Sequence, residues 1–152
     1  RRVLFRSLEG DGKHAGLISL IEEYGSTKGG SLANFYAGNI YLRQGEYKKA
    51  IEHLSAYKGE DKILAQQTKA LIGDAYVELG QLDKAISNYK DAAKSNNVMT
   101  TPFILLKLGQ VYEMQKNNAE ALNCYKRIKT EFPASQEYRE IEKYISRLEN
   151  LQ

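Results

Sequence analysis

Apolar residues follow a helical period along most of this chain. Between residues 31 and 44 they recur three or four positions apart, and after Gly45 a second apolar stripe begins at Ala50. The same succession of two stripes returns on either side of Gly80, and again on either side of residues 116–118. This period is typical of amphipathic helices, and a glycine after the last apolar position is typical of a helix end. The pattern therefore predicts an all-α fold built from helix pairs joined by tight turns.

The three helix pairs carry the same residue types at the same offsets. Each pair has a glycine, a tyrosine three residues later, an alanine twelve residues later and a large apolar or aromatic residue sixteen residues later. These residues are Gly38, Tyr41, Ala50 and Leu54, then Gly73, Tyr76, Ala85 and Tyr89, then Gly109, Tyr112, Ala121 and Tyr125. Because glycine and alanine have almost no side chain, we expect the two helices of each pair to approach closely at these positions.

Two local features distinguish the third pair. Thr101 and Pro102 are residue types favoured at a helix start, and we expect Thr101 to be the N-cap. The turn between the helices reads Lys116-Asn117-Asn118 and contains no glycine. We therefore expect an asparagine to adopt the left-handed conformation in this turn.

The rest of the chain divides around these pairs. Residues 1–7 match no repeat position, and we predict that they are a non-native leader. Residues 8–30 are predicted to be the remnant of a preceding helix pair. The three pairs span residues 31–65, 66–101 and 102–134. An amphipathic stripe in residues 135–152 predicts a capping helix with a polar outer face.

Composition and charge narrow the classes of function. Of the 152 residues, 42% are hydrophobic and 27% are charged, as in globular proteins. The net charge of +3 is supplied by Arg1, Arg2 and Arg6, all in the predicted leader, so the remainder is balanced. Without a basic excess to neutralise phosphates, the sequence argues against nucleic-acid binding. No apolar run reaches the length of a membrane span.

Few residues of the sequence could catalyse a reaction or bind a metal ion. Cys124 and His53 are the one nucleophile and base worth considering, and they fall at equivalent positions two repeats apart. We expect the spacing of the helices to keep them far beyond hydrogen-bonding reach, which predicts no catalytic residue. Two histidines and one cysteine supply few ligands for a metal, and we expect no cofactor and no small-molecule substrate.

The repeated residues resemble tetratricopeptide repeats, whose consensus has Gly at position 8, Tyr at 11, Ala at 20 and an aromatic residue at 24. With position 1 at Ser31, Gln66 and Pro102, the resemblance covers residues 31–134, and Pro133 fits the proline of position 32. The consensus tryptophan of position 4 is absent from all three units. The resemblance implies a right-handed α-solenoid of helix-turn-helix pairs with the capping helix at its C-terminal end.

The resemblance also implies a concave groove, lined by the first helix of each pair, in which a peptide or protein segment binds. The groove residues that it assigns here are Phe35, Asn39, Arg43, Ala70, Asp74, Glu78, Phe103, Leu106, Gln110 and Met114. Further residues at groove positions are Leu32, Leu42, Gln67, Val77 and Glu113. Among these positions Leu32, Leu42 and Leu106 fit the core between repeats as well as they fit the groove.

The groove residues also suggest a ligand. Tetratricopeptide domains that hold the C-terminal carboxylate of chaperones resemble one another in lysines at position 5 and an arginine at position 9. Here Phe35 and Leu106 stand in place of the lysines and Gln110 in place of the arginine. Because those cations are missing, we expect the groove to reject acidic C-terminal peptides. We expect it to bind an apolar or aromatic segment beside Phe35 and Phe103, with a basic residue near Asp74 and Glu78.

A narrower resemblance concerns the cellular role. Residues 21–28 and 36–38, with Ala33, are similar to bacterial envelope tetratricopeptide proteins of the ancillary translocon-subunit type. This implies a periplasmic domain with a membrane anchor upstream of this fragment, and a cytoplasmic location is the alternative. It also implies a non-catalytic scaffold or chaperone-like accessory in envelope assembly or secretion, with a protein or peptide partner. The alternative function is a structural assembly subunit that self-associates through exposed helices.

Overall fold

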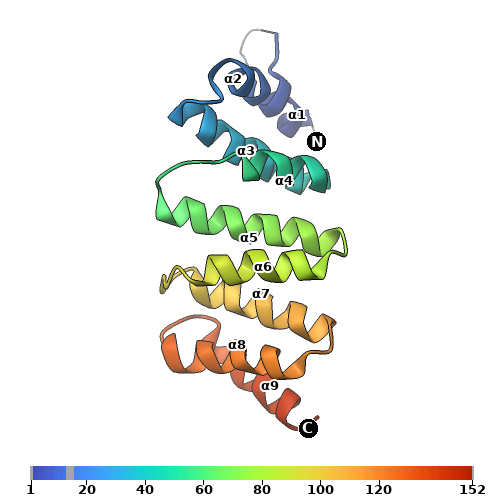
Figure 1. Cartoon of the computed structure of the whole chain (residues 1–152), viewed down its shortest axis with the longest axis vertical. Helices are drawn as coiled ribbons and strands as arrows, with labels where there is room; N and C mark the ends of the chain where they lie inside the picture. Colours follow the sequence, from blue (N-terminus) through green and yellow to red (C-terminus); the bar gives the residue numbers. More distant parts are fainter. Residues whose placement is uncertain (1, 13–15, 152) are drawn as a thin grey trace. The chain divides into compact units, whose positions relative to one another are not determined.

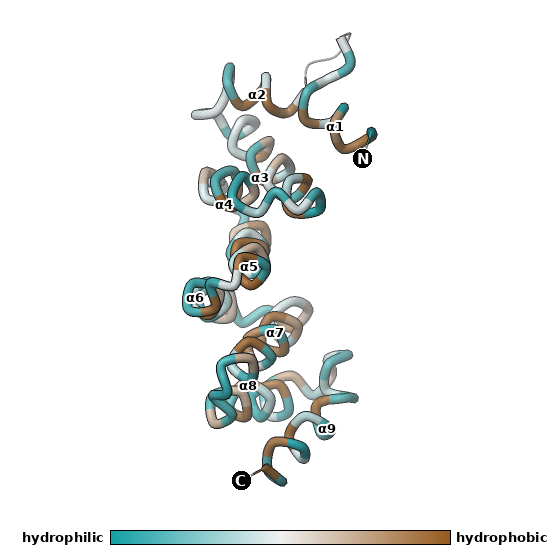
Figure 2. The backbone as a smooth tube through the Cα atoms, turned by 90° about the vertical axis from the view of Figure 1, so that its right-hand side faces the viewer, coloured by the Kyte–Doolittle hydropathy of each residue, from teal (hydrophilic) through white to brown (hydrophobic). Residues whose placement is uncertain are grey.

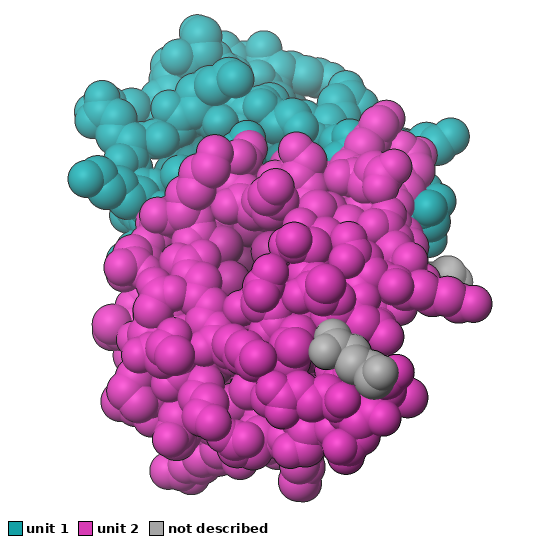
Figure 3. All heavy atoms as spheres, turned by 60° about the horizontal axis from the view of Figure 1, so that its bottom comes forward, with its two compact units in different colours: residues 1–80 teal, residues 81–152 magenta. Residues whose placement is uncertain are grey.

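The computed structural model describes residues 2–12 and 16–151, and its helices follow one another as drawn in Figure 1. The chain divides into two compact units, residues 1–80 and residues 81–152, which are coloured separately in Figure 3. Each unit consists of α-helices joined by short turns and loops. Each has its own buried apolar residues, and the units are described one at a time below.

Unit 1 contains the first five helices. They are α1 (Arg2–Glu9), α2 (Leu17–Tyr24), α3 (Lys28–Arg43), α4 (Tyr47–Ser55) and α5 (Lys62–Glu78). Helix α3 packs against α2, α4 and α5, and it contributes more residues to the core of the unit than any other helix. The fully and nearly buried core residues are Leu8, Phe35, Ala37, Tyr41, Ala50, Leu54 and Ile72.

Unit 2 contains the last four helices. They are α6 (Leu82–Ala93), α7 (Thr101–Met114), α8 (Asn118–Glu131) and α9 (Tyr138–Glu149). Helix α7 is the most hydrophobic of the four along its length (Figure 2), and it packs against both α6 and α8. Helix α9 packs on α8 through Ile141, Ile145 and Leu148, which are buried, while most of its other residues are exposed.

The small residues of the repeat lie where paired helices touch. Ala50 and Ala121 are completely buried. A methyl group added to Gly38 would lie 2.5 Å from Cγ of Leu54 in α4. A methyl group added to Gly109 would overlap the ring of Tyr125 in α8. The close approach predicted for the first and third pairs is therefore confirmed.

The turns between paired helices share one backbone feature. Gly45, Gly80 and Lys116 have φ angles of 80°, 72° and 59°, in the left-handed region. Each follows the last turn of a first helix, which is the position where glycine is preferred. The prediction that an asparagine takes this conformation in the third turn is wrong. Asn117 is instead the N-cap of α8, and its side-chain oxygen accepts a hydrogen bond from the Glu120 amide (3.3 Å).

The start of α7 also differs from the prediction. Thr101 is the first helical residue and not the N-cap. Its hydroxyl group donates to the carbonyl oxygen of Ser95 (2.8 Å) and accepts from the amide of Asn97 (2.9 Å). Thr101 is fully buried, so these bonds fix the loop between α6 and α7 from within. The tertiary position of this hydroxyl thus overrides its capping preference.

The helix boundaries refine the predicted repeat boundaries. The first helices begin at Lys28, Lys62 and Thr101, a few residues before the predicted starts of the first two repeats and one before the third. Residues 2–9 form α1, in which Val3 and Phe5 are exposed and Leu8 is buried. That residues 1–7 are a non-native leader stays a prediction. Arg1 and Gln152 lie outside the described residues.

Candidate functional site

The predicted groove residues are divided between the two units. Residues of α3 and α5 belong to unit 1, and residues of α7 belong to unit 2. In unit 1, Arg43 and Glu78 are exposed, and Asn39, Ala70 and Asp74 are partly buried. In unit 2, Phe103, Gln110 and Met114 are exposed and Leu106 is partly buried. Nearly all of these side chains therefore reach the surface of their own unit.

Phe35 is the exception, and the prediction that it lines the groove is wrong. Its side chain is only 5% exposed and belongs to the core of unit 1. The ring packs edge-on against Tyr36 (5.5 Å between centroids) and against Tyr57 (5.9 Å). Tyr36, its neighbour in sequence, is exposed instead. Adjacent residues of a helix point in directions about 100° apart, so Phe35 and Tyr36 lie on different faces of α3.

Glu113 also has a different role from the one its repeat position implies. Its carboxylate accepts a hydrogen bond from the Tyr125 hydroxyl (2.5 Å) and two from the guanidinium of Arg147 (2.7 and 3.0 Å). These residues come from α7, α8 and α9. The rings of Tyr125 and Tyr144 lie 5.2 Å apart beside this network. Glu113 thus holds the capping helix in place and is a structural residue of unit 2.

Electrostatics explain why this network is ionised. Burial would raise the pKa of the Glu113 carboxyl group, but the hydrogen bonds from Arg147 and Tyr125 outweigh burial and lower the pKa below its ordinary value. Burial and the neighbouring carboxylate raise the pKa of Tyr125, so its hydroxyl group stays protonated and donates. The result is a charge-assisted network, which is stronger than one between neutral groups.

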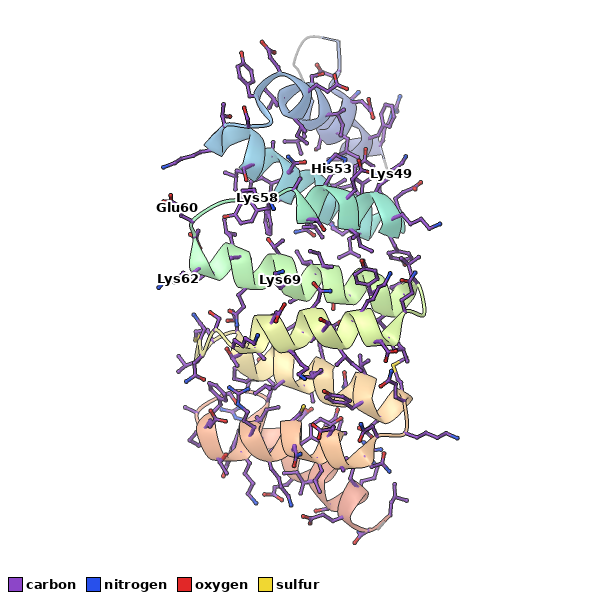
Figure 4. The ribbon with its side chains drawn as sticks, viewed as in Figure 1. Lys49, His53, Lys58, Glu60, Lys62 and Lys69 are labelled. Carbon is purple, nitrogen blue, oxygen red and sulfur yellow. The ribbon has the colours of Figure 1, made fainter. Side chains whose placement is uncertain are left out.

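His53 of unit 1 makes packing and hydrogen-bonding contacts with residues of α3. Nδ1 of His53 lies 2.9 Å from Oδ1 of Asn34, whose amide nitrogen donates to the Gly30 carbonyl. The imidazole stacks on the Tyr41 ring (5.2 Å between centroids), over which Lys49 also lies. Burial lowers the pKa of His53 below its ordinary value, so the ring is neutral at pH 7. His53 and Lys49 are labelled on α4 in Figure 4, with charged residues of the following loop and of α5.

A pocket that the sequence reasoning did not identify lies in unit 1. It has a volume of about 300 Å³ and lies between the start of α3 and the loop that joins α4 to α5. Its walls include Leu32, Tyr57 and Lys58, and the Lys58 amide donates to the hydroxyl group of Ser31 (2.7 Å). Leu32 is therefore a surface residue at a groove position. The loop residues of this pocket carry none of the consensus residue types at their positions of the repeat, which is why the repeat pattern gives no signal for it.

Cys124 and His53 belong to different units: His53 lies in unit 1 and Cys124 lies in unit 2. Cys124 is buried, and burial raises the pKa of its thiol to about 12.

We expect the Cys124 thiol to react slowly with Ellman's reagent in the native protein, because the thiolate is the reactive form. At pH 8 its rate should be roughly a hundredfold to a thousandfold lower than in the urea-unfolded chain. The absorbance of the released thiolate measures both rates. Equal native and unfolded rates would contradict the buried position.

Among the residues that the structure describes, neither a metal-binding cluster nor a membrane-spanning helix is found. No three or more of their His, Cys, Asp or Glu side chains gather so that they could hold a metal ion, and His14 lies outside the described part of the chain. None of the described helices is both long enough and apolar enough to cross a membrane.

Comparisons with known proteins agree with the repeat pattern. A family model of the tetratricopeptide repeat matches residues 20–62 and 71–135. Among solved structures, a crystal structure of MamA is similar, with a TM-score of 0.67 and 17% sequence identity over 89% of this chain and 84% of that chain. A search of curated proteins found no match. At this identity the likeness to MamA concerns the fold alone.

The family match spans most of the chain, and the predicted fold class, an all-α solenoid of helix-turn-helix pairs, is confirmed. Tetratricopeptide repeat domains generally mediate protein–protein interaction. The chain belongs to the tetratricopeptide repeat family.

Proposed function

We propose that this protein is a non-catalytic module that binds a protein or peptide segment through residues at groove positions of the repeat, which α3 and α5 carry in unit 1 and α7 carries in unit 2. Its role would be that of a scaffold or chaperone-like accessory in bacterial envelope assembly or secretion. The general function of the family supports the binding role. The resemblance of residues 21–28 and 36–38 to envelope proteins of the ancillary translocon-subunit type supports the narrower role.

The observation that carries the proposal is the uneven exposure of apolar residues on α7. Phe103 and Met114, at two groove positions, are 50% and 58% exposed. Every other apolar residue of this helix is buried or half-buried. Aromatic residues and methionine are enriched in the contact regions of protein interfaces. Two such side chains at the predicted binding positions favour a partner with apolar side chains.

Phe103 has a second property that suits binding. The ammonium group of Lys107 lies 4.5 Å from the centroid of the Phe103 ring. This contact favours one orientation of the ring while half of its surface stays exposed. An aromatic side chain fixed in this way loses little conformational entropy when a partner covers it. In unit 1, Tyr36 and Leu32 replace Phe35 as the exposed large side chains of α3.

Crosslinking and pull-down with the intact, untruncated protein test the proposal. We expect Phe103→Ser combined with Met114→Ser to reduce capture of a native protein partner at least about tenfold, because exposed aromatic anchors carry much of the binding energy of an interface. Circular dichroism should show the wild-type melting temperature, since both side chains lie at the surface.

The matched control changes two other exposed apolar residues of unit 2. Val98 and Met99 lie in the loop between α6 and α7, and both are more exposed than Phe103. Val98→Ser with Met99→Ser should leave capture unchanged. Equal loss in both double variants would contradict the groove. A concentration-dependent dimer in light scattering, abolished by the Phe103 and Met114 changes, would favour the self-associating assembly subunit instead.

A further inference from the structure

Unit 2 carries all of the sulfur in this chain, which consists of one cysteine and two methionines. Cys124 is buried, and burial raises the pKa of its thiol to about 12, so the reactive thiolate is scarce. The side chains of Met99 and Met114 are 81% and 58% exposed. A dissolved oxidant therefore reaches the two thioethers before it reaches the thiol.

Met114 lies at a groove position of the repeat. It is the last residue of α7 and stands 11 residues after Phe103. This separation is about three helical turns, so both side chains lie on one face of the helix. Gln110, one turn before Met114, is also exposed. The thioether is thus part of the surface through which α7 is proposed to bind a partner.

Met99 is exposed at a different place and provides an internal reference. It lies in the loop between α6 and α7, where its amide donates to the side-chain oxygen of Asn97 (2.8 Å). This bond holds the backbone while the Met99 side chain stays in water. Because Met99 is not at a groove position, the two methionines share one chemistry and differ in location.

Oxidation of a methionine by hydrogen peroxide needs no catalytic residue. The thioether sulfur attacks one oxygen of the peroxide, and the O–O bond breaks as the S–O bond forms. The other oxygen leaves as hydroxide and takes up the proton of the attacked oxygen, so that sulfur is oxidised to the sulfoxide and peroxide is reduced to water. An apolar side chain becomes polar, and methionine sulfoxide reductases reverse the change.

We propose that Met114 is an oxidation site through which peroxide lowers the affinity of α7 for an apolar segment. This inference rests on the proposed function, because it requires the groove positions of α7 to bind such a segment. An apolar side chain has no donor for the sulfoxide oxygen, and covering an unpaired polar group is unfavourable. Oxidation of Met114 should therefore lower the affinity about fivefold or more.

Peptide mapping by mass spectrometry tests the oxidation site itself. The full chain is treated with increasing concentrations of hydrogen peroxide. We expect Met99 and Met114 each to gain one oxygen atom under conditions that leave Cys124 unmodified, whereas all three should react in urea. A native chain in which Met99 is fully oxidised and Met114 is untouched would overturn the proposal.

Retention of synthetic heptapeptides on the immobilised full chain tests the effect on binding. The probes carry a central phenylalanine or leucine flanked by serine, and an all-serine peptide gives the background. In Met99→Leu, Met114 is the only methionine. Retention of the probes by this variant should fall about fivefold or more as Met114 sulfoxide accumulates, and it should return after reductase treatment. The melting temperature in circular dichroism should not change, since the side chain is exposed.

Met114→Leu is the matched variant, because it removes the sulfur from α7 and leaves Met99 open to oxidation. The ratio of retention after and before peroxide is compared, and for this variant it should stay at one. An equal fall of the ratio in Met114→Leu and Met99→Leu would overturn the proposal, as would Met114 sulfoxide without any fall. If the untreated wild-type chain retains the probes no better than the all-serine peptide, the proposed function fails and this inference fails with it. Loss of the peroxide effect alone overturns only the inference.

Discussion

Alanine in place of Gly38 is expected to destabilise unit 1, whereas alanine in place of Gly29, in the same helix, is expected to stabilise it. A methyl group at Gly38 would lie 2.5 Å from Leu54 Cγ and 3.0 Å from the Leu54 backbone nitrogen. Leu54 is fully buried, so neither its side chain nor α4 can move aside freely. Overpacking of this kind costs about 1–3 kcal/mol, which exceeds the gain of up to about 1 kcal/mol from the higher helix propensity of alanine.

Gly29 is the control because it lies in the same helix but faces open space. A methyl group there would meet nothing nearer than the Thr27 hydroxyl at 3.8 Å. Alanine should therefore raise the free energy of unfolding by about 0.4–1 kcal/mol through the reduced entropy of the unfolded chain. Urea unfolding followed by circular dichroism measures both effects, and hydrogen exchange of the α3 and α4 amides assigns them to unit 1. A decrease of equal size at both positions would contradict the close contact between α3 and α4.

The repeat offsets predicted the features that depend on backbone proximity. Three copies of one pattern specify where two helices touch, and the buried Ala50 and Ala121 lie at those positions. The same offsets could have predicted the conformation of Lys116, because it stands seven residues after Gly109 as Gly45 does after Gly38. The prediction relied on the residue type, and asparagine was favoured over lysine. Position in the repeat decides the backbone conformation here, and residue type is secondary.

The errors at Phe35 and Glu113 have a different origin. Both residues were assigned from helix-face positions of the family consensus. A residue at the edge of a helix face can turn toward the core or toward solvent, and neighbouring helices decide which. Phe35 turns into the core of unit 1, where its ring contacts Tyr57, 22 residues later in the chain. Glu113 meets Arg147, 34 residues later in the chain, through the packing of three helices. No local pattern contains that information.

Glu113→Gln is expected to lower the free energy of unfolding and to raise hydrogen exchange in the capping helix α9 at neutral pH. In acid the substitution should have no such effect. Glu113→Gln removes the charge that Arg147 and Tyr125 hold, although the amide oxygen still accepts a hydrogen bond. Hydrogen bonds to charged groups contribute about 1.5–3 kcal/mol, and exposure of half of the Arg147 side chain reduces this. We therefore expect a loss of about 1–2 kcal/mol at pH 7, measured by urea unfolding and by hydrogen exchange of α9 amides.

The pH dependence follows from the lowered pKa of Glu113. A carboxyl group whose pKa is lower in the folded state stabilises the protein above the ordinary pKa of about 4.3. That contribution is lost as pH falls below this value and through the lower pKa of the folded state. The wild-type protein and Glu113→Gln should therefore converge in stability as the pH is lowered through this range. A difference of the same size at pH 3 as at pH 7 would contradict the ionised network.

Glu142→Gln is the control for this prediction. Glu142 lies on α9 and pairs with Lys129 of α8, so this substitution also removes one ion pair between the capping helix and its neighbour. The Glu142 side chain is 57% exposed, against 17% for Glu113. Because water screens exposed pairs, we expect Glu142→Gln to cost less than about 0.5 kcal/mol at pH 7. Equal effects of the two substitutions would mean that charge alone attaches α9, and that the buried hydrogen bond from Tyr125 adds nothing.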